Sequence, residues 1–290
     1  MEYLYYPGCS LESAGRPYDE SLRAVFRVLG LPLKELEDWN CCGATMYMSV
    51  DETTSLAISA RNLALAERNG GTNLVAPCSA CYTVLLKTNR FLRDSPELKA
   101  KVDRILGEVG LSCKLAVKVR HPLDVLVNDV GIETIARAAR SSLGGLPFAP
   151  YYGCQIVRPE RGFDDPEYPI TMDTLLERLG AKAVYFPVKT RCCGGMLMTT
   201  FPDVCLQLVK ELLECATQNG ARCVVTTCPL CQINLEAYQK RVNRKFGTAF
   251  HVPVLVFTQL LGLALGCSEE ELGLQRNLVP LKTELVPLHA

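Results

Sequence analysis

The chain has 290 residues, of which 48% are hydrophobic and 21% charged, a composition typical of a folded protein with room for two domains. Lys and Arg together number 31, and so do Asp and Glu, so the formal net charge is zero. This balance argues against nucleic acid and against an anionic membrane surface as partners.

The N-terminal stretch MEYLYYPGCS lacks the basic region and long apolar region of a signal peptide. The most apolar stretch, residues 252–266, contains Pro253 and Gln259 and is shorter than the ~20 residues that a membrane helix needs. We expect a buried strand followed by a helix there, no membrane insertion, and a cytoplasmic location. Fifteen cysteines in a reducing compartment favour metal or redox chemistry over a disulfide framework.

The first half of the chain alternates strand-like and helical patterns, with cysteines between them. An aromatic, strand-like run ends at Cys9, and helical patterns follow over residues 17–30 and 53–71. The vicinal pair Cys41-Cys42 lies between these two patterns. The apolar run TNLVAPC then leads into a C-x2-C motif formed by Cys78 and Cys81, which precedes another helical segment.

The second half repeats this order after the Gly- and Pro-containing stretch 141–150. FAPYYGC ends at Cys154, RCCGGM carries the pair Cys192-Cys193, and CVVTTC leads into the motif Cys228 and Cys231. Helical patterns cover residues 170–180 and 201–220. The two halves read C-x31-CC-x35-C-x2-C and C-x37-CC-x34-C-x2-C.

The alternation of strands and helices predicts an α/β protein. We expect two similar domains related by a pseudo-twofold axis, each a mainly parallel sheet flanked by helices. Their predicted ranges are 1–145 and 146–290, the second with a C-terminal extension. The motif cysteines fall where strands end, so we expect them at the carboxyl ends of the sheets, with the two sets facing a shared cleft.

Each half offers five thiolates, whereas a structural zinc site takes four ligands and a cubane [4Fe–4S] cluster takes four cysteines. Two adjacent cysteines are also poorly placed to bind two different irons of one compact cubane cluster. A larger, more open iron–sulfur assembly accommodates both the count and the adjacency. Two alternatives stay open at this point: a zinc-stabilised scaffold that binds other subunits, and cysteines that are merely structural.

Five further cysteines lie outside the repeated pattern, within helical or apolar stretches or in segments without a motif. Free cysteine is commonly buried as a small hydrophobe, so we expect core positions for them. They are Cys113, Cys205, Cys215, Cys223 and Cys267.

The ordered cysteines, together with CSACY, VRHPLDVLVNDVG and CPLCQINLE, resemble the cysteine-rich CCG domain family over essentially the whole chain. The tandem arrangement is similar to that of the B subunits of heterodisulfide reductases. The resemblance implies two noncubane [4Fe–4S] clusters. One would be held by Cys9, Cys41, Cys42, Cys78 and Cys81, and the other by Cys154, Cys192, Cys193, Cys228 and Cys231.

The resemblance also implies an activity. The chain would be the catalytic iron–sulfur subunit of a heterodisulfide reductase-type oxidoreductase, as in methanogenesis. It would reduce the disulfide of coenzyme M and coenzyme B, or a related low-molecular-weight disulfide, to two thiols between facing clusters. The alternative is a non-catalytic electron-transfer subunit of a bacterial oxidoreductase or of a sulfur-oxidising relative.

The chain has no G-x-G-x-x-G dinucleotide fingerprint, so electrons must come from partners. By resemblance these are a small subunit with cubane [4Fe–4S] clusters and a flavin-containing subunit. Lys189 and Arg191, just before the second vicinal pair, are candidates for binding an anionic substrate group. His121, at the start of a helical segment, is a candidate proton donor, although a structural role is the commoner one.

Overall fold

A computed structural model describes residues 2–44, 46–158 and 162–282. The chain forms two compact units. The first contains Met1–Cys9 and Gly30–Pro122, and the second contains Ser10–Leu29 and Leu123–Ala290. The predicted division after residue 145 follows the repeat in the sequence, whereas these units follow contacts in space, which is why the two divisions differ.

The first unit is built on a four-stranded parallel sheet with the strand order β2-β1-β3-β4. Its strands are short: β1 (Tyr3–Tyr5), β2 (Leu33–Glu35), β3 (Asn73–Val75) and β4 (Lys118–Arg120). Its helical elements are η1 (Met46–Ser49), α3 (Glu52–Arg68), α4 (Ser79–Asp94) and α5 (Pro96–Gly107). The short helix α1 (Gly8–Leu11) begins in this unit and ends in the other.

The second unit contains a parallel sheet of the same topology, with the strand order β6-β5-β7-β8. Its strands are β5 (Pro147–Tyr151), β6 (Lys182–Ala183), β7 (Cys223–Thr226) and β8 (Val254–Val256). The helices that belong to the second repeat are α8 (Thr171–Arg178), η3 (Leu197–Thr199), α9 (Pro202–Gln218), α10 (Pro229–Ala237), α11 (Gln239–Phe246), α12 (Phe257–Ala264) and η4 (Leu274–Arg276). The predicted fold class is thus confirmed: two similar α/β halves with parallel sheets flanked by helices.

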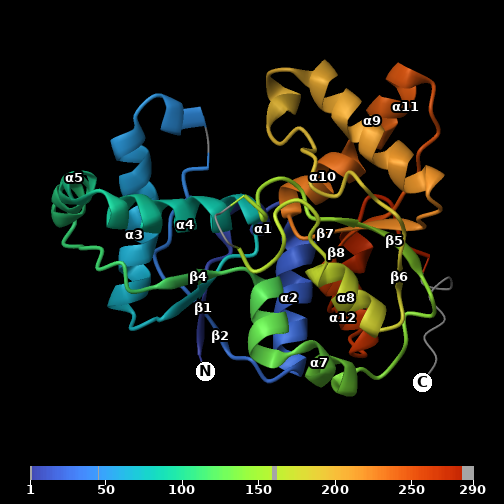
Figure 1. Cartoon of the computed structure of the whole chain (residues 1–290), viewed down its shortest axis with the longest axis horizontal. Helices are drawn as coiled ribbons and strands as arrows, with labels where there is room; N and C mark the ends of the chain where they lie inside the picture. Colours follow the sequence, from blue (N-terminus) through green and yellow to red (C-terminus); the bar gives the residue numbers. More distant parts are fainter. Residues whose placement is uncertain (1, 45, 159–161, 283–290) are drawn as a thin grey trace. The chain divides into compact units, whose positions relative to one another are not determined.

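The second unit also takes helices from the first repeat. These are α2 (Arg16–Val28), the π-helix η2 (Val125–Val130) and α7 (Ile132–Ala138), while the short helix α6 (Pro122–Asp124) begins in the first unit and ends in the second. Helix α2 packs against α12, where the Ser21 hydroxyl lies 2.6 Å from that of Thr258 and the Tyr18 ring meets the edge of Phe257. Figure 1 shows α2, α7, α8 and α12 gathered together.

Local sequence explains where the helices begin. Asp51 accepts a hydrogen bond of 3.0 Å from the Thr54 backbone N–H and so caps α3. Ser95 accepts one from Leu98 and caps α5, with proline at the first helical position. Strands β1, β7 and β8 are buried throughout, as expected where helices cover both faces of a parallel sheet.

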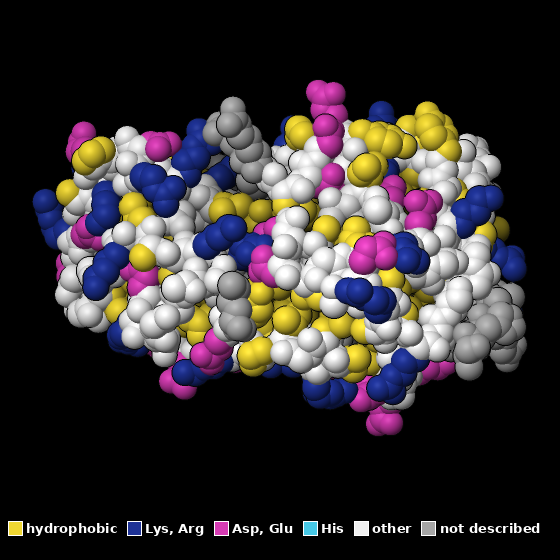
Figure 2. Space-filling model, turned by 60° about the horizontal axis from the view of Figure 1, so that its bottom comes forward, with side chains coloured by type: hydrophobic (Ala, Val, Ile, Leu, Met, Phe, Trp, Pro, Cys, Tyr) yellow, Lys and Arg dark blue, Asp and Glu magenta, His cyan; other side chains and the backbone are white. Residues whose placement is uncertain are grey.

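Basic and acidic side chains are interspersed on the face that Figure 2 shows, in keeping with the zero formal charge. Over the described ranges, no helix of the chain has both the length and the apolar character required to cross a membrane.

Candidate metal centres

In each unit, three neighbouring strands deliver the five motif cysteines to one edge of the sheet. In the first unit Cys9 follows β1, the pair Cys41-Cys42 follows β2, and Cys78 and Cys81 follow β3. Because the strands are parallel, their carboxyl ends meet at the same edge, and the three loops converge there. The loops after β5, β6 and β7 do the same in the second unit with Cys154, the pair Cys192-Cys193, and Cys228 and Cys231. We call these two sets the first and the second quintet.

Hydrogen bonds link four thiols of the first quintet, and the fifth, that of Cys9, lies within electrostatic range of Cys41. Cys42 shares hydrogen bonds with both Cys41 and Cys81, Cys81 also bonds to Cys78, and Cys41 interacts electrostatically with Cys9. These interactions therefore follow the order Cys9, Cys41, Cys42, Cys81, Cys78.

The second quintet has a similar connectivity, but here the first cysteine also takes part in a hydrogen bond. Cys192 shares hydrogen bonds with Cys154 and Cys193, and Cys231 bonds to Cys228. The sulfur atoms of Cys193 and Cys231 are 3.6 Å apart. The cysteines thus follow one another in the same order in both quintets, although the sulfur that accepts two hydrogen bonds is Cys42 in the first and Cys192 in the second.

These contacts concentrate negative charge on one sulfur in each quintet. Hydrogen bonds from the thiols of Cys41 and Cys81 lower the pKa of Cys42 to about 4. The two thiols that neighbour Cys192 lower its pKa to about 2 in the same way. The donors show the opposite effect, since the hydrogen bond to Cys42 raises the pKa of Cys81 well above its ordinary value. Without a metal, only one sulfur of each quintet ionises readily while its neighbours keep their protons. A bound metal cation allows all of the thiols to ionise.

Each quintet has a buried floor and an open edge. Cys42, Cys78 and Cys81 are buried, whereas Cys9 and Cys41 are exposed. In the second quintet Cys193, Cys228 and Cys231 are buried, Cys154 is half-buried and Cys192 is exposed. A metal group bound at such a site would be held by the buried cysteines and would stay accessible to solvent at the exposed ones.

A tyrosine beneath each quintet holds the loop that carries the vicinal pair. The Tyr6 hydroxyl donates a hydrogen bond of 2.8 Å to the carbonyl oxygen of Asn40, and Tyr151 donates one of 2.7 Å to that of Arg191. Asn40 and Arg191 each directly precede a vicinal pair. Burial, and next the negative charge on Cys81, raises the pKa of Tyr6 well above its ordinary value, and burial does the same for Tyr151. Both hydroxyls therefore stay protonated and able to donate.

A glycine lies against the last cysteine of each quintet. Gly8 has φ +69°, and a Cβ added there would lie 3.1 Å from the Cys81 sulfur. Gly153 has φ +71°, and its added Cβ would lie 3.0 Å from the Cys231 sulfur. Glycine is required at both positions by the left-handed backbone and by the close approach of the sulfur.

The donor sets fit an iron–sulfur group. Each consists of five soft sulfur donors brought to one edge of a sheet, and soft thiolate ligands select zinc, copper(I) or iron–sulfur clusters. Cys78 and Cys228 occupy the residue before a helix, yet neither uses its side chain to cap that helix. Among the described residues, no three His, Cys, Asp or Glu side chains are arranged around a single metal ion.

The other candidate residues lie inside the units or in ion pairs. His121 is fully buried, and its Nε2 lies 3.0 Å from the carbonyl oxygen of Pro77, which only accepts, so Nε2 carries the hydrogen. Pro77 precedes Cys78, so His121 supports the loop of the first C-x2-C motif. Lys189 is 1% exposed, and its ammonium donates to Asp173 at 2.6 Å and to the Pro169 carbonyl at 2.9 Å.

That ammonium is thus committed to the interior of the second unit, where it also lies over the Tyr168 ring. Arg191 is exposed and forms an ion pair of 3.0 Å with Glu211. Neither cation therefore stands unpaired beside the second quintet.

The cysteines outside the quintets lie largely in the core, as expected. Burial raises the pKa of Cys113 to about 11 and that of Cys223 to about 12. Cys205 and Cys267 are buried as well, and Cys215 is half-buried.

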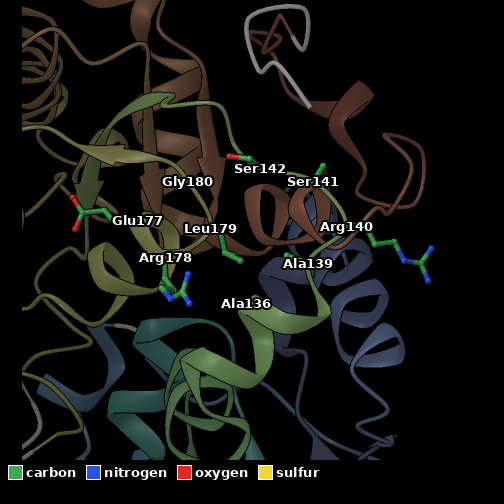
Figure 3. A pocket seen from close by; sticks show the side chains of 9 residues that line it. All are labelled: Ala136, Ala139, Arg140, Ser141, Ser142, Glu177, Arg178, Leu179 and Gly180. Carbon is green, nitrogen blue, oxygen red and sulfur yellow. The ribbon is translucent and has the colours of Figure 1, made fainter. Parts of the chain in front are cut away.

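One further cavity in the second unit has a volume of about 400 Å³ and contains none of the motif cysteines. It lies where α7 and α8 end, and Figure 3 shows Arg140 and Glu177 extending away from one another there. The Arg178 guanidinium is bound by Glu133 at 2.8 and 2.9 Å.

Sequence reasoning missed the two tyrosines, the two glycines and Asn234, whose amide reaches the Cys193 sulfur. A signal for the first four was present: both halves place YY and then Gly immediately before the first cysteine, with one extra residue, Pro7, in the first half.

Comparison with known proteins identifies the family. Residues 3–86 and 148–236 match the profile of the CCG family, a cysteine-rich domain. The chain is 34% identical over 280 residues to an 8-methylmenaquinol:fumarate reductase membrane anchor subunit of Wolinella succinogenes, covering 96% of this chain and 97% of that one. It is 33% identical over 279 residues to the B subunit of a ferredoxin/F420H2-dependent CoB-CoM heterodisulfide reductase of Methanosarcina acetivorans, covering 94% and 92%.

A protein of Archaeoglobus profundus, described as similar to heterodisulfide reductase B subunits, is 33% identical over 280 residues, covering 94% of this chain and 93% of that one. A hypothetical protein from Helicobacter pylori shares the fold, with a TM-score of 0.81 at 16% identity over 97% of this chain and 52% of that structure. With both halves matched and such relatives along nearly its whole length, the chain belongs to the cysteine-rich CCG domain family, in the tandem form that heterodisulfide reductase B subunits share.

Proposed function

We propose that this chain is the iron–sulfur subunit that reduces a small-molecule disulfide in a heterodisulfide reductase-type complex. The observation that carries the proposal is the presence of two complete quintets in one chain, each with its cysteines at the carboxyl ends of three neighbouring parallel strands. Its relatives among heterodisulfide reductase B subunits support the same function.

Each quintet would hold one noncubane [4Fe–4S] cluster. When bound, the two clusters supply one electron each, which matches the two electrons and two protons that convert a disulfide into two thiols. The names of the Methanosarcina relatives make the disulfide of coenzyme M and coenzyme B the first candidate substrate. A related low-molecular-weight disulfide is the second.

The residues of the chain position these groups. Tyr6 and Tyr151 fix the carbonyl before each vicinal pair, and the buried cysteines form the floor of each site. Cys41 and Cys192 are exposed residues, so one side of each quintet is open to a substrate or to an electron donor. His121 acts as a support for the first quintet, because its Nε2–H is bound to the Pro77 carbonyl.

The electrons come from other subunits in this proposal, a small protein with cubane [4Fe–4S] clusters and a flavin-containing protein. We place the complex in the cytoplasm, where a reducing environment keeps the fifteen thiols available for metal binding.

The test is an anaerobic titration of the reduced protein with the heterodisulfide of coenzyme M and coenzyme B, followed by electron paramagnetic resonance (EPR). We expect oxidation of the reduced protein and release of two thiols for every two electrons consumed. Cys193→Ser should abolish the response, and Cys113→Ser, which alters a buried cysteine outside the quintets, should keep it. A protein that carries its full iron yet is oxidised by no disulfide would contradict the proposal.

A second function is supported by the relative in Wolinella succinogenes, which is named as a subunit of a fumarate reductase. The chain would then transfer electrons without acting on a disulfide. Oxidation of the reduced protein by a partner subunit alone, with no response to any disulfide, distinguishes this function from the first.

A further inference from the structure

The second quintet receives a hydrogen bond from an amide side chain on α10. Asn234 is 2% exposed, and its Nδ2 lies 3.4 Å from the sulfur of Cys193. The same nitrogen lies 2.8 Å from the carbonyl oxygen of Gly195 and 3.3 Å from that of Cys193.

The orientation of this amide is fixed by its neighbours. Both carbonyl oxygens only accept hydrogen bonds, so the atom that faces them must be the NH2 nitrogen of Asn234 rather than its oxygen. The amide hydrogens therefore point at the loop Cys193–Gly195 and at the Cys193 sulfur. The contact lies at the centre of the second quintet, since the sulfur of Cys193 is also 3.6 Å from that of Cys231.

The first quintet has no equivalent donor at the matching position. Asn234 follows Cys231 by three residues, and Val84 follows Cys81 by three residues on α4. Residues three apart lie on the same face of a helix, so the two side chains take equivalent places. An isopropyl group has no N–H to donate.

Hydrogen bonds to the ligand sulfurs are among the factors that set the reduction potential of an iron–sulfur cluster. Reduction adds negative charge to the cluster and its thiolates, and an N–H group directed at a ligand sulfur stabilises that charge. The donor therefore favours the reduced state of the group to which it points.

We propose that Asn234 is a positioning residue that acts through Cys193 to raise the reduction potential of the second quintet's cluster, and that Val84 leaves the first without this effect. The proposal rests on the proposed function only in requiring that both quintets hold iron–sulfur clusters. It makes the two sites unequal as electron acceptors, although their cysteines match.

The experiment is an anaerobic redox titration followed by EPR, with iron and acid-labile sulfide measured in every sample. No disulfide is present, so the result is independent of the catalytic part of the proposed function. Asn234→Leu, a replacement of similar size, should lower the midpoint potential of one spectral component and leave the other unchanged. Val84→Asn should raise the midpoint potential of the other component.

The matched control is Asn219→Leu. Asn219 donates its amide to the carbonyl oxygen of Cys215 at 2.8 Å and lies 3.7 Å from the Cys215 sulfur, but Cys215 is outside the quintets. This variant should change neither potential. Full iron with unchanged potentials in Asn234→Leu would overturn the proposal. Loss of iron from a folded Asn234→Leu protein would overturn it as well, because Asn234 would then be needed to hold the loop rather than to set the potential.

Discussion

Tyr6 and Asn40 are 34 residues apart in the chain, yet the Tyr6 hydroxyl donates a hydrogen bond of 2.8 Å to the Asn40 carbonyl oxygen. Tyr151 and Arg191 repeat the arrangement in the second unit. Each bond connects the carboxyl end of one strand to the loop with the vicinal cysteines after its neighbour, and so it holds two parts of a quintet together.

Replacing Tyr6 should weaken metal binding at the first quintet, and replacing Tyr151 should weaken it at the second. Tyr6→Phe leaves a carbonyl without its donor, a loss of about 1–3 kcal/mol in the free energy of unfolding if the site stays buried. We expect Tyr6→Phe to reduce the iron content of the first quintet only. Tyr151→Phe should reduce the iron content of the second quintet only. Tyr185→Phe, at a side chain that is 68% exposed, is the control. Equal iron in all three variants would show that the hydroxyls have no role in loading.

Variants of Gly8 and Gly153 can separate two effects of an added side chain, namely a clash with a quintet sulfur and strain in the left-handed backbone. Gly8→Ala and Gly70→Ala both introduce alanine at similar positive φ values, +69° and +72°. Only Gly8 has a sulfur within reach, since nothing lies within 4 Å of a Cβ at Gly70. We expect Gly8→Ala to lose iron at the first quintet and Gly70→Ala to keep it. Gly153→Ala and Gly220→Ala form the corresponding pair in the second unit, and equal iron within each pair would contradict the close approach.

The buried pair of Lys189 and Asp173 should be a structural requirement of the second unit. Lys189→Met leaves the Asp173 carboxylate buried without its cation, which costs on the order of 3–5 kcal/mol. The double variant with Asp173→Leu should recover much of that loss, because neither charge is then buried alone. Denaturant unfolding measures both. The more exposed pair of Lys210 and Glu214 serves as the control, and Lys210→Met should change stability by less than about 1 kcal/mol.

Glu236 should make stability depend on pH. Burial raises the pKa of the Glu236 carboxyl from 4.5 to about 7. A hydrogen bond of 3.0 Å from the Val279 backbone N–H opposes this shift but is the weaker effect. The folded state therefore binds the proton more tightly than the unfolded state. The resulting stabilisation is complete below pH 4.5 and is lost as the pH rises to about 7, by about 3 kcal/mol in total.

Glu236→Gln removes this titration. Unfolding of wild type and variant at pH 5.5 and pH 8 should show a larger fall for the wild type. Because cluster stability also changes with pH, the difference between the two proteins is the quantity to compare. An identical fall in both would show that the carboxyl keeps its ordinary pKa.

The sequence predicted the fold class and most of the helices well, because strand and helix periodicities were strong and the cysteines gave the repeat. The predicted helix over residues 17–30 is α2, but its position in the second unit was not predictable. Amphipathic spacing shows that one face of a helix is buried, not which sheet or helix buries it.

The candidate site was predictable only in part. The sequence identifies which cysteines repeat, and Tyr6 and Tyr151 both stand three residues before the first cysteine, but it does not show which carbonyl groups their hydroxyls bind. Lys189 stands before a cysteine pair and is a plausible substrate ligand by sequence. Only its three-dimensional surroundings reveal the carboxylate of Asp173, 16 residues away in the chain.

Iron and acid-labile sulfide per chain, measured after anaerobic reconstitution, test most directly whether the two quintets hold clusters. We predict about eight irons in the wild type and about four when either Cys42→Ser or Cys193→Ser disables one quintet. Zinc without acid-labile sulfide, or iron near zero in the reconstituted wild type, would contradict the account.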